Sequence, residues 1–307
     1  MRPYGIAAII LGAVGLVAVG CAFDPEGLEV EQSDGTILPA ELVEYHNDRG
    51  ETLQAVLLRP DAATPEPMPA VLVLHGSGGL FSTPDRNDTK LEVAPEFADW
   101  AGMLTRRGYA VLLPDSFYSR GYFEWDDHPR GVDETDRLVM RSYDAQGALR
   151  YACEQSFVDC ERVGVVGFSN GGSVALLAVH ERLDELAGMS ELPPAAERER
   201  FVASFPFYPG CGLQGLVDDP ARPYYPTAPV AIHHGREDPL LEDCPARVDA
   251  VRAVAEERSA AEPPLSLTIY DGAGHDFDGA PHGAAETSAR DQARTATLAD
   301  LERILMP

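Results

Sequence analysis

The stretch Gly167-Phe168-Ser169-Asn170-Gly171 stands between an apolar run at 163–166 and a segment with a helical pattern at 171–183. It matches the Gly-x-Ser-x-Gly turn, which carries a serine from the end of a strand into the start of a helix. A hydroxyl group reacts well from such a turn because the two glycines remove side chains that would block it. The following helix points the positive end of its dipole at the place where an oxyanion would form. The motif therefore predicts that Ser169 is a nucleophile.

The sequence on both sides of this motif alternates between predicted strands and predicted helices. Apolar runs predict strands at 70–74, 109–113, 163–166, 202–207, 230–233 and 265–270, after an opening hairpin at 41–45 and 53–58. Helical patterns predict helices at 95–107, 138–152, 171–183, 246–257 and 287–305, and an acidic surface helix or insertion at 184–200. Buried strands that alternate with helices form a mostly parallel central sheet with helices on both faces. We therefore expect one α/β catalytic domain over residues 41–307.

A nucleophilic serine needs a base, and the base needs a carboxylate that orients it. In folds that use this turn, the acid and the histidine follow the serine in that order, in loops after later strands. Asp238 and His275 lie in the loops after the last two predicted strands. Glu237 and Asp243 are rival acids near the first of these loops. The order and the strand-end positions predict Asp238 as the acid and His275 as the base.

The segment His75-Gly76-Ser77-Gly78-Gly79 follows the predicted strand at 70–74. The same architecture places one backbone donor of an oxyanion hole at that position and a second in the residue after the nucleophile. Such amides stabilise the negative charge that develops when a carbonyl group is attacked. We expect the amides of Ser77 and Asn170 to form this site. We expect His75 to be a structural hydrogen-bonding residue rather than a proton carrier.

Five segments give residues 41–305 a resemblance to a known family. They are His75-Gly76-Ser77-Gly78-Gly79, Pro114-Asp115-Ser116-Phe117, Gly167-Phe168-Ser169-Asn170-Gly171-Gly172, Tyr208-Pro209-Gly210-Cys211 and Gly272-Ala273-Gly274-His275-Asp276-Phe277. The chain resembles the dienelactone-hydrolase-like branch of the α/β-hydrolases. The resemblance implies the α/β-hydrolase fold without a large lid, and a small-molecule ester or lactone as substrate. Members that open dienelactones use a cysteine nucleophile. Ser169 departs from them, which argues against dienelactone itself and leaves ester hydrolysis intact.

Two arginines are candidates for substrate binding at the mouth of the pocket. Arg120 follows the segment 114–117, and Arg141 lies in the predicted helix before the serine turn. A guanidinium group there would bind a substrate carboxylate through two hydrogen bonds. The alternative is that each arginine pairs with one of the many local acids.

The charge balance of the chain limits its partners. Fifty acidic and 24 basic residues give a formal net charge of −26 at pH 7. Such a surface repels phosphate backbones, so we expect no nucleic-acid binding. The sequence has no His-Glu-x-x-His motif, no Cys/His zinc spacing and no nucleotide-binding glycine motif. We therefore expect neither a metal nor a cofactor.

The N-terminal residues have the pattern of an export signal. An apolar run at 6–19 is shorter than a membrane-spanning helix requires. It ends in Ala18-Val19-Gly20-Cys21, which resembles a bacterial lipobox with alanine where leucine is common. We expect a signal peptide at 1–20, a lipid on Cys21 and a tether at 21–40, so that the catalytic domain is anchored to a membrane outside the cytoplasm. The alternatives are an ordinary cleaved signal peptide and an uncleaved anchor.

Four cysteines remain once the lipobox cysteine is set aside, and an even number in an oxidising compartment favours disulfides. Free buried thiols are the alternative. Cys153 and Cys160 bracket the connection between a helix and a strand before the serine turn. Cys211 and Cys244 follow neighbouring parallel strands, whose spacing of about 4.8 Å lets the trailing loops bring two sulfurs into bonding range. We therefore predict the pairs Cys153–Cys160 and Cys211–Cys244.

Together these observations predict a membrane-tethered serine hydrolase that cleaves a carboxylic ester or a lactone through an acyl-enzyme on Ser169. Two alternatives remain open: a peptidase of the same fold, and a catalytically degenerate binding protein of the cell surface. The presence of Ser169, Asp238 and His275 together argues against the binding protein, because binding alone gives no reason to keep all three.

Overall fold

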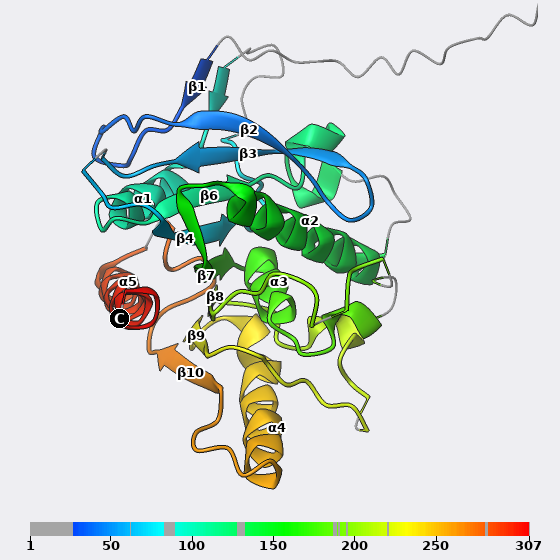
Figure 1. Cartoon of the computed structure of the whole chain (residues 1–307). Coiled ribbons are helices and arrows are strands. Elements are labelled where there is room, and N and C mark those ends of the chain that lie inside the picture. The colour runs from blue at the N-terminus through cyan, green and yellow to red at the C-terminus, as the bar shows by residue number, and fades with distance from the viewer. Residues whose placement is uncertain are drawn as a thin grey trace, which may run out of the picture.

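The structure is a computed structural model that describes residues 27–306, except for positions 62, 83–89, 128–132, 187–188, 190, 195, 220 and 280–281. The predicted signal peptide at 1–20 and the predicted lipidation site Cys21 lie outside the described residues. Figure 1 shows the described part as a twisted sheet with helices on either side of it.

Eight strands form the central sheet, in the spatial order β10-β9-β8-β7-β4-β6-β3-β2 (Figure 1). Their bounds are β2 (Glu41–His46), β3 (Thr52–Leu58), β4 (Met68–Leu74), β6 (Ala110–Pro114), β7 (Val158–Phe168), β8 (Ala203–Phe207), β9 (Val230–Gly235) and β10 (Leu265–Tyr270). The strands from β10 to β6 pair in parallel, whereas β3 pairs antiparallel with both β6 and β2. Parallel strands bring their carboxyl ends to one edge, so the loops after β4, β7, β9 and β10 share that edge.

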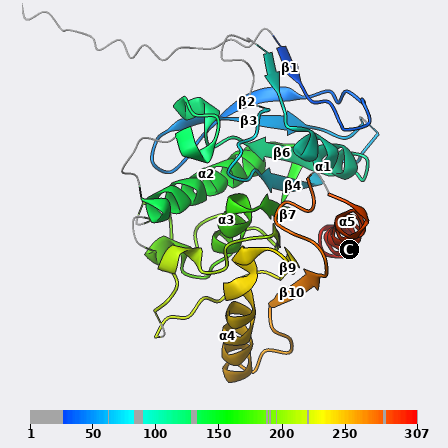
Figure 2. The same ribbon diagram turned by 180° about the vertical axis from the view of Figure 1, so that it is seen from behind.

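Helices cover both faces of the sheet. Their bounds are α1 (Pro95–Thr105), α2 (Glu134–Glu154), α3 (Asn170–Ala178), α4 (Cys244–Glu257) and α5 (Ala284–Leu305). Buried residues of α2, α3 and α4 belong to one hydrophobic cluster, and those of α1 and α5 belong to a second cluster on the opposite face. Figures 1 and 2 show the two sets of helices on opposite sides of the strands. The predicted α/β-hydrolase architecture, a mostly parallel sheet between two helical layers, is confirmed.

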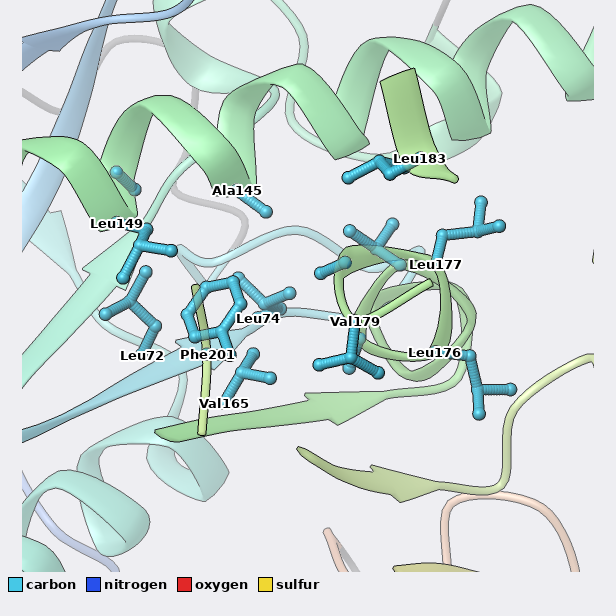
Figure 3. Packing of buried hydrophobic residues seen from close by; sticks show 14 of the residues in the cluster. Leu72, Leu74, Ala145, Leu149, Val165, Leu176, Leu177, Val179, Leu183 and Phe201 are labelled. Carbon is cyan, nitrogen blue, oxygen red and sulfur yellow. The ribbon is translucent and has the colours of Figure 1, made fainter. Parts of the chain in front are cut away.

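The central strand β4 shows why an apolar run becomes a strand here. All seven of its residues are buried. Leu72 and Leu74 belong to the cluster under α2 and α3, and Val71 and Val73 belong to the cluster under α1 and α5. Figure 3 shows Leu72 and Leu74 in the first of these layers, near Leu149 of α2. Successive side chains of a strand point to opposite faces, so burial on both faces requires an uninterrupted apolar run.

The predicted strands and helices have counterparts within a few residues, with one exception. The acidic segment 184–200, predicted as a surface helix or an insertion, does not form the helix in its described part, where the regular element is a 3-10 turn at Leu183–Glu185. Pro193 and Pro194 interrupt this segment. Each proline lacks an amide donor, so a continuous helix through them would lose hydrogen bonds.

Residues 27–40, which we expected to be part of a tether, pack on the domain instead. Strand β1 (Gly27–Glu29) pairs in parallel with β5 (Lys90–Glu92). Val30 is buried, with 1% of its surface exposed, and the Gln32 side chain accepts a hydrogen bond from Arg106 at 2.9 Å. The folded domain therefore begins by residue 27, and the tether that remains predicted is the segment 21–26.

Both predicted disulfides are present. Cys153–Cys160 closes the connection between α2 and β7, and Cys211–Cys244 joins the segment after β8 to the start of α4. Disulfides persist in oxidising compartments, so this pair of bonds indicates an extracytoplasmic protein. None of the described helices combines the length and the apolar composition needed to cross a bilayer.

Candidate active site

Ser169 lies on the turn between β7 and α3, with a backbone φ of 52° and ψ of −116°. Few residues other than glycine adopt a positive φ, and such strained positions cluster at functional sites. A Cβ atom on Gly167 would lie 2.1 Å from the carbonyl oxygen of Gly171, and one on Gly171 would lie 2.4 Å from that of His75. The Ser169 amide donates to the Phe207 carbonyl oxygen at 2.9 Å. Glycine on both sides therefore permits the turn, and the neighbouring strand β8 fixes it.

The structure brings Ser169, His275 and Asp238 together at the carboxyl edge of the sheet. His275 lies in the loop after β10, and its Nε2 atom is 2.9 Å from Oγ of Ser169. Its Nδ1 atom is 2.7 Å from Oδ2 of Asp238, in the loop after β9. Both distances are within hydrogen-bond range. This arrangement can move a proton from the hydroxyl group to the imidazole and hold the resulting cation beside a carboxylate.

The surroundings of Asp238 distinguish it from the two rival acids. Asp238 is 3% exposed, whereas Glu237 and Asp243 are exposed. Its Oδ1 atom accepts a hydrogen bond from the Leu240 amide at 2.9 Å, opposite the oxygen that faces His275. Burial by itself would raise the pKa of Asp238, but the hydrogen bonds from His275 and from the Leu240 amide hold it below its ordinary value. The carboxylate is therefore charged at neutral pH and fixed in orientation.

A pocket of about 320 Å³ opens over Ser169 and His275. Its walls contain aromatic rings, the glycine-rich loop after β4 and two carboxylates. The aromatic rings are those of Phe81, Phe97, Phe168 and Tyr208, the loop comprises residues 76–79, and the carboxylates are those of Glu96 and Asp276. The lining residues that the structure describes include no lysine or arginine. The pocket suits a small substrate with an apolar part.

The two residues predicted to bind the oxyanion lie in the two segments next to Ser169, namely the start of α3 and the loop after β4. Asn170 is the first residue of α3, so its amide has no acceptor within the helix. Ser77 lines the pocket in the loop after β4. His75 precedes this loop and is fully buried, and burial holds its pKa well below the ordinary value. A neutral, buried His75 fits the predicted hydrogen-bonding role and does not fit proton transfer to a substrate.

The structure does not bring Arg120 or Arg141 to the pocket. Arg120 donates to Glu51 at 2.7 Å and to Asp144 at 2.8 Å, which matches the alternative of pairing with local acids. Arg141 is 3% exposed and donates to the side-chain oxygen of Asn170 at 2.5 Å and to a backbone carbonyl oxygen at 2.6 Å. Neither forms the candidate clamp for a substrate carboxylate, because both guanidinium groups already bind acceptors within the protein.

Sequence reasoning missed two features of the pocket wall. Tyr208 follows β8 with a φ of 38°, its ring lies 4.9 Å from the His275 ring, and its hydroxyl group donates to Asp276 at 3.1 Å. Burial raises the pKa of Tyr208 and that of Asp276. The strand-end rule that located the other residues also points to Tyr208, since β8 lies between β7 and β9. Glu96 comes from helix α1, and no sequence signal places it at the pocket.

Two other histidines are buried away from the pocket. His233 contacts the hydroxyl groups of Tyr270 and Thr297, and His180 contacts the carbonyl oxygen of Tyr225. Burial lowers the pKa of each histidine to about 4. Among the described residues, no three histidine, cysteine or acidic side chains are grouped so that they could hold a metal ion.

The mostly parallel sheet, the strand-to-helix turn that carries Ser169, and the later loops that carry Asp238 and His275 together define an α/β-hydrolase fold. The model of the dienelactone hydrolase family matches residues 53–305. The chain therefore belongs to the dienelactone hydrolase family, as the resemblance implied.

Known proteins similar to this chain include a probable lactonase, a carboxymethylenebutenolidase and an esterase. The chain is 30% identical over 149 residues to a Bradyrhizobium protein named "Probable 2-oxo-3-(5-oxofuran-2-ylidene)propanoate lactonase", covering 46% of this chain and 50% of that protein. It is 26% identical over 194 residues to a carboxymethylenebutenolidase of Rhodococcus opacus, covering 60% of this chain and 66% of that protein. These matches thus span between half and two thirds of the relatives' lengths. A thermophilic esterase from Thermogutta terrifontis has the same fold, with a TM-score of 0.59 at 18% identity over 86% of this chain and 92% of that chain.

Proposed function

We propose that this protein hydrolyses a carboxylic ester or a lactone through an acyl-enzyme on Ser169. The observation that carries the proposal is the hydrogen-bonded series from Ser169 Oγ to His275 Nε2 and from His275 Nδ1 to Asp238, in which Ser169 and His275 line a pocket. Membership of the dienelactone hydrolase family supports it. A serine in place of the cysteine favours esters or lactones other than dienelactone itself.

In the first half of the proposed reaction, Oγ of Ser169 attacks the carbonyl carbon while Nε2 of His275 takes the hydroxyl proton. The carbonyl oxygen becomes an oxyanion that accepts hydrogen bonds from the amides of Ser77 and Asn170. Asp238 stabilises the imidazolium. When the tetrahedral intermediate collapses, the bond to the alkoxy oxygen breaks, and His275 returns the proton to that oxygen.

In the second half, water attacks the acyl carbon and His275 takes one of its protons. The second tetrahedral intermediate breaks the bond to Oγ, which recovers its proton from His275. The acid product leaves and the enzyme is restored. A lactone follows the same steps, except that its alcohol stays attached to the acyl group until water releases the hydroxy acid.

The test compares the wild-type protein with Ser169→Ala on a short p-nitrophenyl ester, a panel of lactones and an aminoacyl p-nitroanilide. We expect hydrolysis of esters or lactones, a loss of about 10⁴- to 10⁶-fold in kcat for the variant, and labelling of Ser169 by a fluorophosphonate probe. Anilide cleavage without esterase activity would favour a peptidase. Inactivity on all three substrate classes would favour a binding protein.

We further propose that a lipid on Cys21 anchors the domain outside the cytoplasm, with 1–20 as the signal peptide and 21–26 as the tether. The two disulfides support the compartment. Expression in a bacterial host should yield a membrane-associated protein with a fatty-acylated N-terminal peptide, and Cys21→Ala should accumulate precursor. Mature protein that starts at another residue would instead indicate ordinary signal cleavage.

A further inference from the structure

Arg141 connects the two segments that carry the proposed oxyanion donors. It projects from α2 and is 3% exposed. Its Nη1 atom donates to the side-chain oxygen of Asn170 at 2.5 Å, on the serine turn. Its Nη2 atom donates to the carbonyl oxygen of His75 at 2.6 Å, at the start of the loop that carries Ser77. One guanidinium group therefore fixes the distance between the serine turn and that loop.

The imidazole of His75 extends this connection to the Ser77 amide. His75 Nε2 accepts a hydrogen bond from the Ser116 amide at 3.1 Å, which places the proton of the neutral ring on Nδ1. Nδ1 then donates to the carbonyl oxygen of Gly76 at 2.7 Å. That carbonyl and the N–H of Ser77 belong to one peptide group. The hydrogen bond at its oxygen therefore orients and polarises the amide that would bind the oxyanion.

The charge of Arg141 is buried without a direct counter-ion. Within the described residues, no carboxylate oxygen lies within 4.0 Å of its guanidinium group, and its Nε atom has no hydrogen-bond partner. Asp144, one turn further along α2, is instead bound by Arg120 through two hydrogen bonds of 2.8 Å. Burial lowers the pKa of Arg141 to about 10, so the group stays charged at neutral pH.

A buried cation whose hydrogen bonds go only to neutral acceptors is costly, because it has lost its hydration without gaining a direct ion pair, and the charges of Asp144 and Asp115 offset only part of the effect of burial on its pKa. The cost is offset when a negative charge develops nearby. In the proposed reaction that charge appears on the oxyanion, which forms beside the two segments that Arg141 binds.

We propose that Arg141 is a positioning residue for the oxyanion hole: it holds the Ser77 loop and the Asn170 turn at the separation that the tetrahedral intermediate requires. This inference rests on the proposed function of Ser169. Arg141 acts through the backbone amides and does not touch the substrate.

The first test is Arg141→Met, with Arg198→Met as the matched control. Arg198 is also nearly buried, with 8% of its side chain exposed, and it donates to Asp184 and to the Pro193 carbonyl oxygen, away from the pocket. We expect Arg141→Met to lower kcat by about 10- to 100-fold and to change KM by less than about threefold. The loss in kcat should be smaller than the loss of about 10²- to 10³-fold that follows from removing an oxyanion donor. Arg198→Met should lower the Tm and leave kcat unchanged. Equal kcat in the two variants would overturn the proposal.

A second pair of variants covers the case in which Arg141→Met does not fold. Asn170→Ala keeps the backbone amide and removes the acceptor that Arg141 binds, so it should also lower kcat with little change in KM. Arg141→Lys keeps the charge and one of the two contacts, and it should recover part of the loss. A wild-type kcat in Asn170→Ala, or an Arg141→Lys variant no better than Arg141→Met, would count against the proposal.

Ligand binding separates this inference from the proposed function. Oγ of Ser169 adds to the carbonyl carbon of an aryl trifluoromethyl ketone while His275 takes the hydroxyl proton, so that the carbonyl oxygen becomes an oxyanion. The matching methyl ketone largely remains unreacted and therefore mimics the bound substrate. In Arg141→Met and in Asn170→Ala, the affinity for the trifluoromethyl ketone should fall by the same factor as kcat. The affinity of both variants for the methyl ketone should equal that of the wild type. If the wild type hydrolyses esters through Ser169 but the variants lose affinity for both ketones by the same factor, only the positioning role fails. If the wild type neither hydrolyses esters nor binds the trifluoromethyl ketone, the proposed function fails first.

Discussion

His275 Nδ1 lies 2.7 Å from Oδ2 of Asp238, and this carboxylate is 3% exposed while the histidine beside it reaches the pocket. The contact fixes the ring so that its other nitrogen faces Ser169. A carboxylate in this position selects the tautomer with a proton on Nδ1 and leaves Nε2 free to accept the serine proton. In the proposed reaction the buried acid would orient the base without contacting the substrate.

The first prediction concerns this acid. Asp238→Asn keeps the size of the side chain but can hold His275 in the wrong tautomer, so kcat for ester hydrolysis should fall by about 10⁴-fold. Glu237→Gln is the matched control, because Glu237 is the adjacent acid in the chain and is exposed. Steady-state kinetics should show little change for the control. An Asp238→Asn variant within tenfold of wild type would mean that another group orients His275.

The second prediction concerns the disulfides. Cys211–Cys244 encloses a sequence separation of 33 residues that includes Asp238, whereas Cys153–Cys160 encloses 7. By the chain-entropy argument the longer loop contributes about 4 kcal/mol to the free energy of unfolding and the shorter about 2 kcal/mol. Urea unfolding should therefore show a larger loss for the Cys211→Ala/Cys244→Ala double variant than for Cys153→Ala/Cys160→Ala. The opposite order would contradict this view.

The triad positions and the mostly parallel character of the sheet could be predicted because they depend on local sequence patterns, whereas the spatial order of the strands is known only from the structure. Each predicted strand is an apolar run, and the loops after β7, β9 and β10 carry Ser169, Asp238 and His275 in chain order. In a parallel sheet those loops must share an edge, so chain order alone brings the residues together. The Cys211–Cys244 pair follows from the same neighbourhood of strands, and the Cys153–Cys160 pair follows from the short connection between a helix and a strand that these cysteines bracket.

The remaining features depend on contacts that a one-dimensional pattern does not contain. Glu96 lies on helix α1, far from the triad residues in sequence, and its place in the pocket wall depends on how α1 packs. The sequence positions of Arg120 and Arg141 are compatible with a substrate clamp, but in the folded chain Arg120 binds Asp144 and Arg141 binds the side chain of Asn170. Residues 27–40 read as a polar tether because their strand partner, β5, is distant in sequence.

The third prediction concerns acid stability. The pKa of His180 and that of His233 are about 4 in the folded protein, below the ordinary value of 6.5. Below pH 6.5 the unfolded chain therefore binds more protons than the folded one, and stability is lost as the pH falls towards 4, by up to roughly 3 kcal/mol per histidine. Burial raises the pKa of Asp115 to about 6, which acts in the opposite direction over the same range.

Removing one buried histidine tests this assignment. His233→Gln should reduce the slope of unfolding free energy against pH between pH 4 and 6.5, whatever its effect on stability at neutral pH. His282→Gln, at an exposed histidine, is the control. Urea titrations at several pH values give both slopes. Parallel curves for wild type and His233→Gln would show that acid stability is controlled elsewhere.

The last prediction concerns the charge of the substrate. Glu96 and Asp276 are the acidic side chains among the described residues that line the pocket. Burial raises the pKa of Glu96, and so do the charges of Asp276, Asp278 and Asp99. An ester with a carboxylate near the scissile bond should therefore have a kcat/KM about tenfold below that of a neutral ester of the same shape, and an ammonium ester should be favoured. Glu96→Gln with Asp276→Asn should narrow this gap, and so should high salt. Glu242→Gln, at an exposed acid outside the pocket, should not. A carboxylate ester that is preferred by the wild type would show that the acidic wall does not select the substrate.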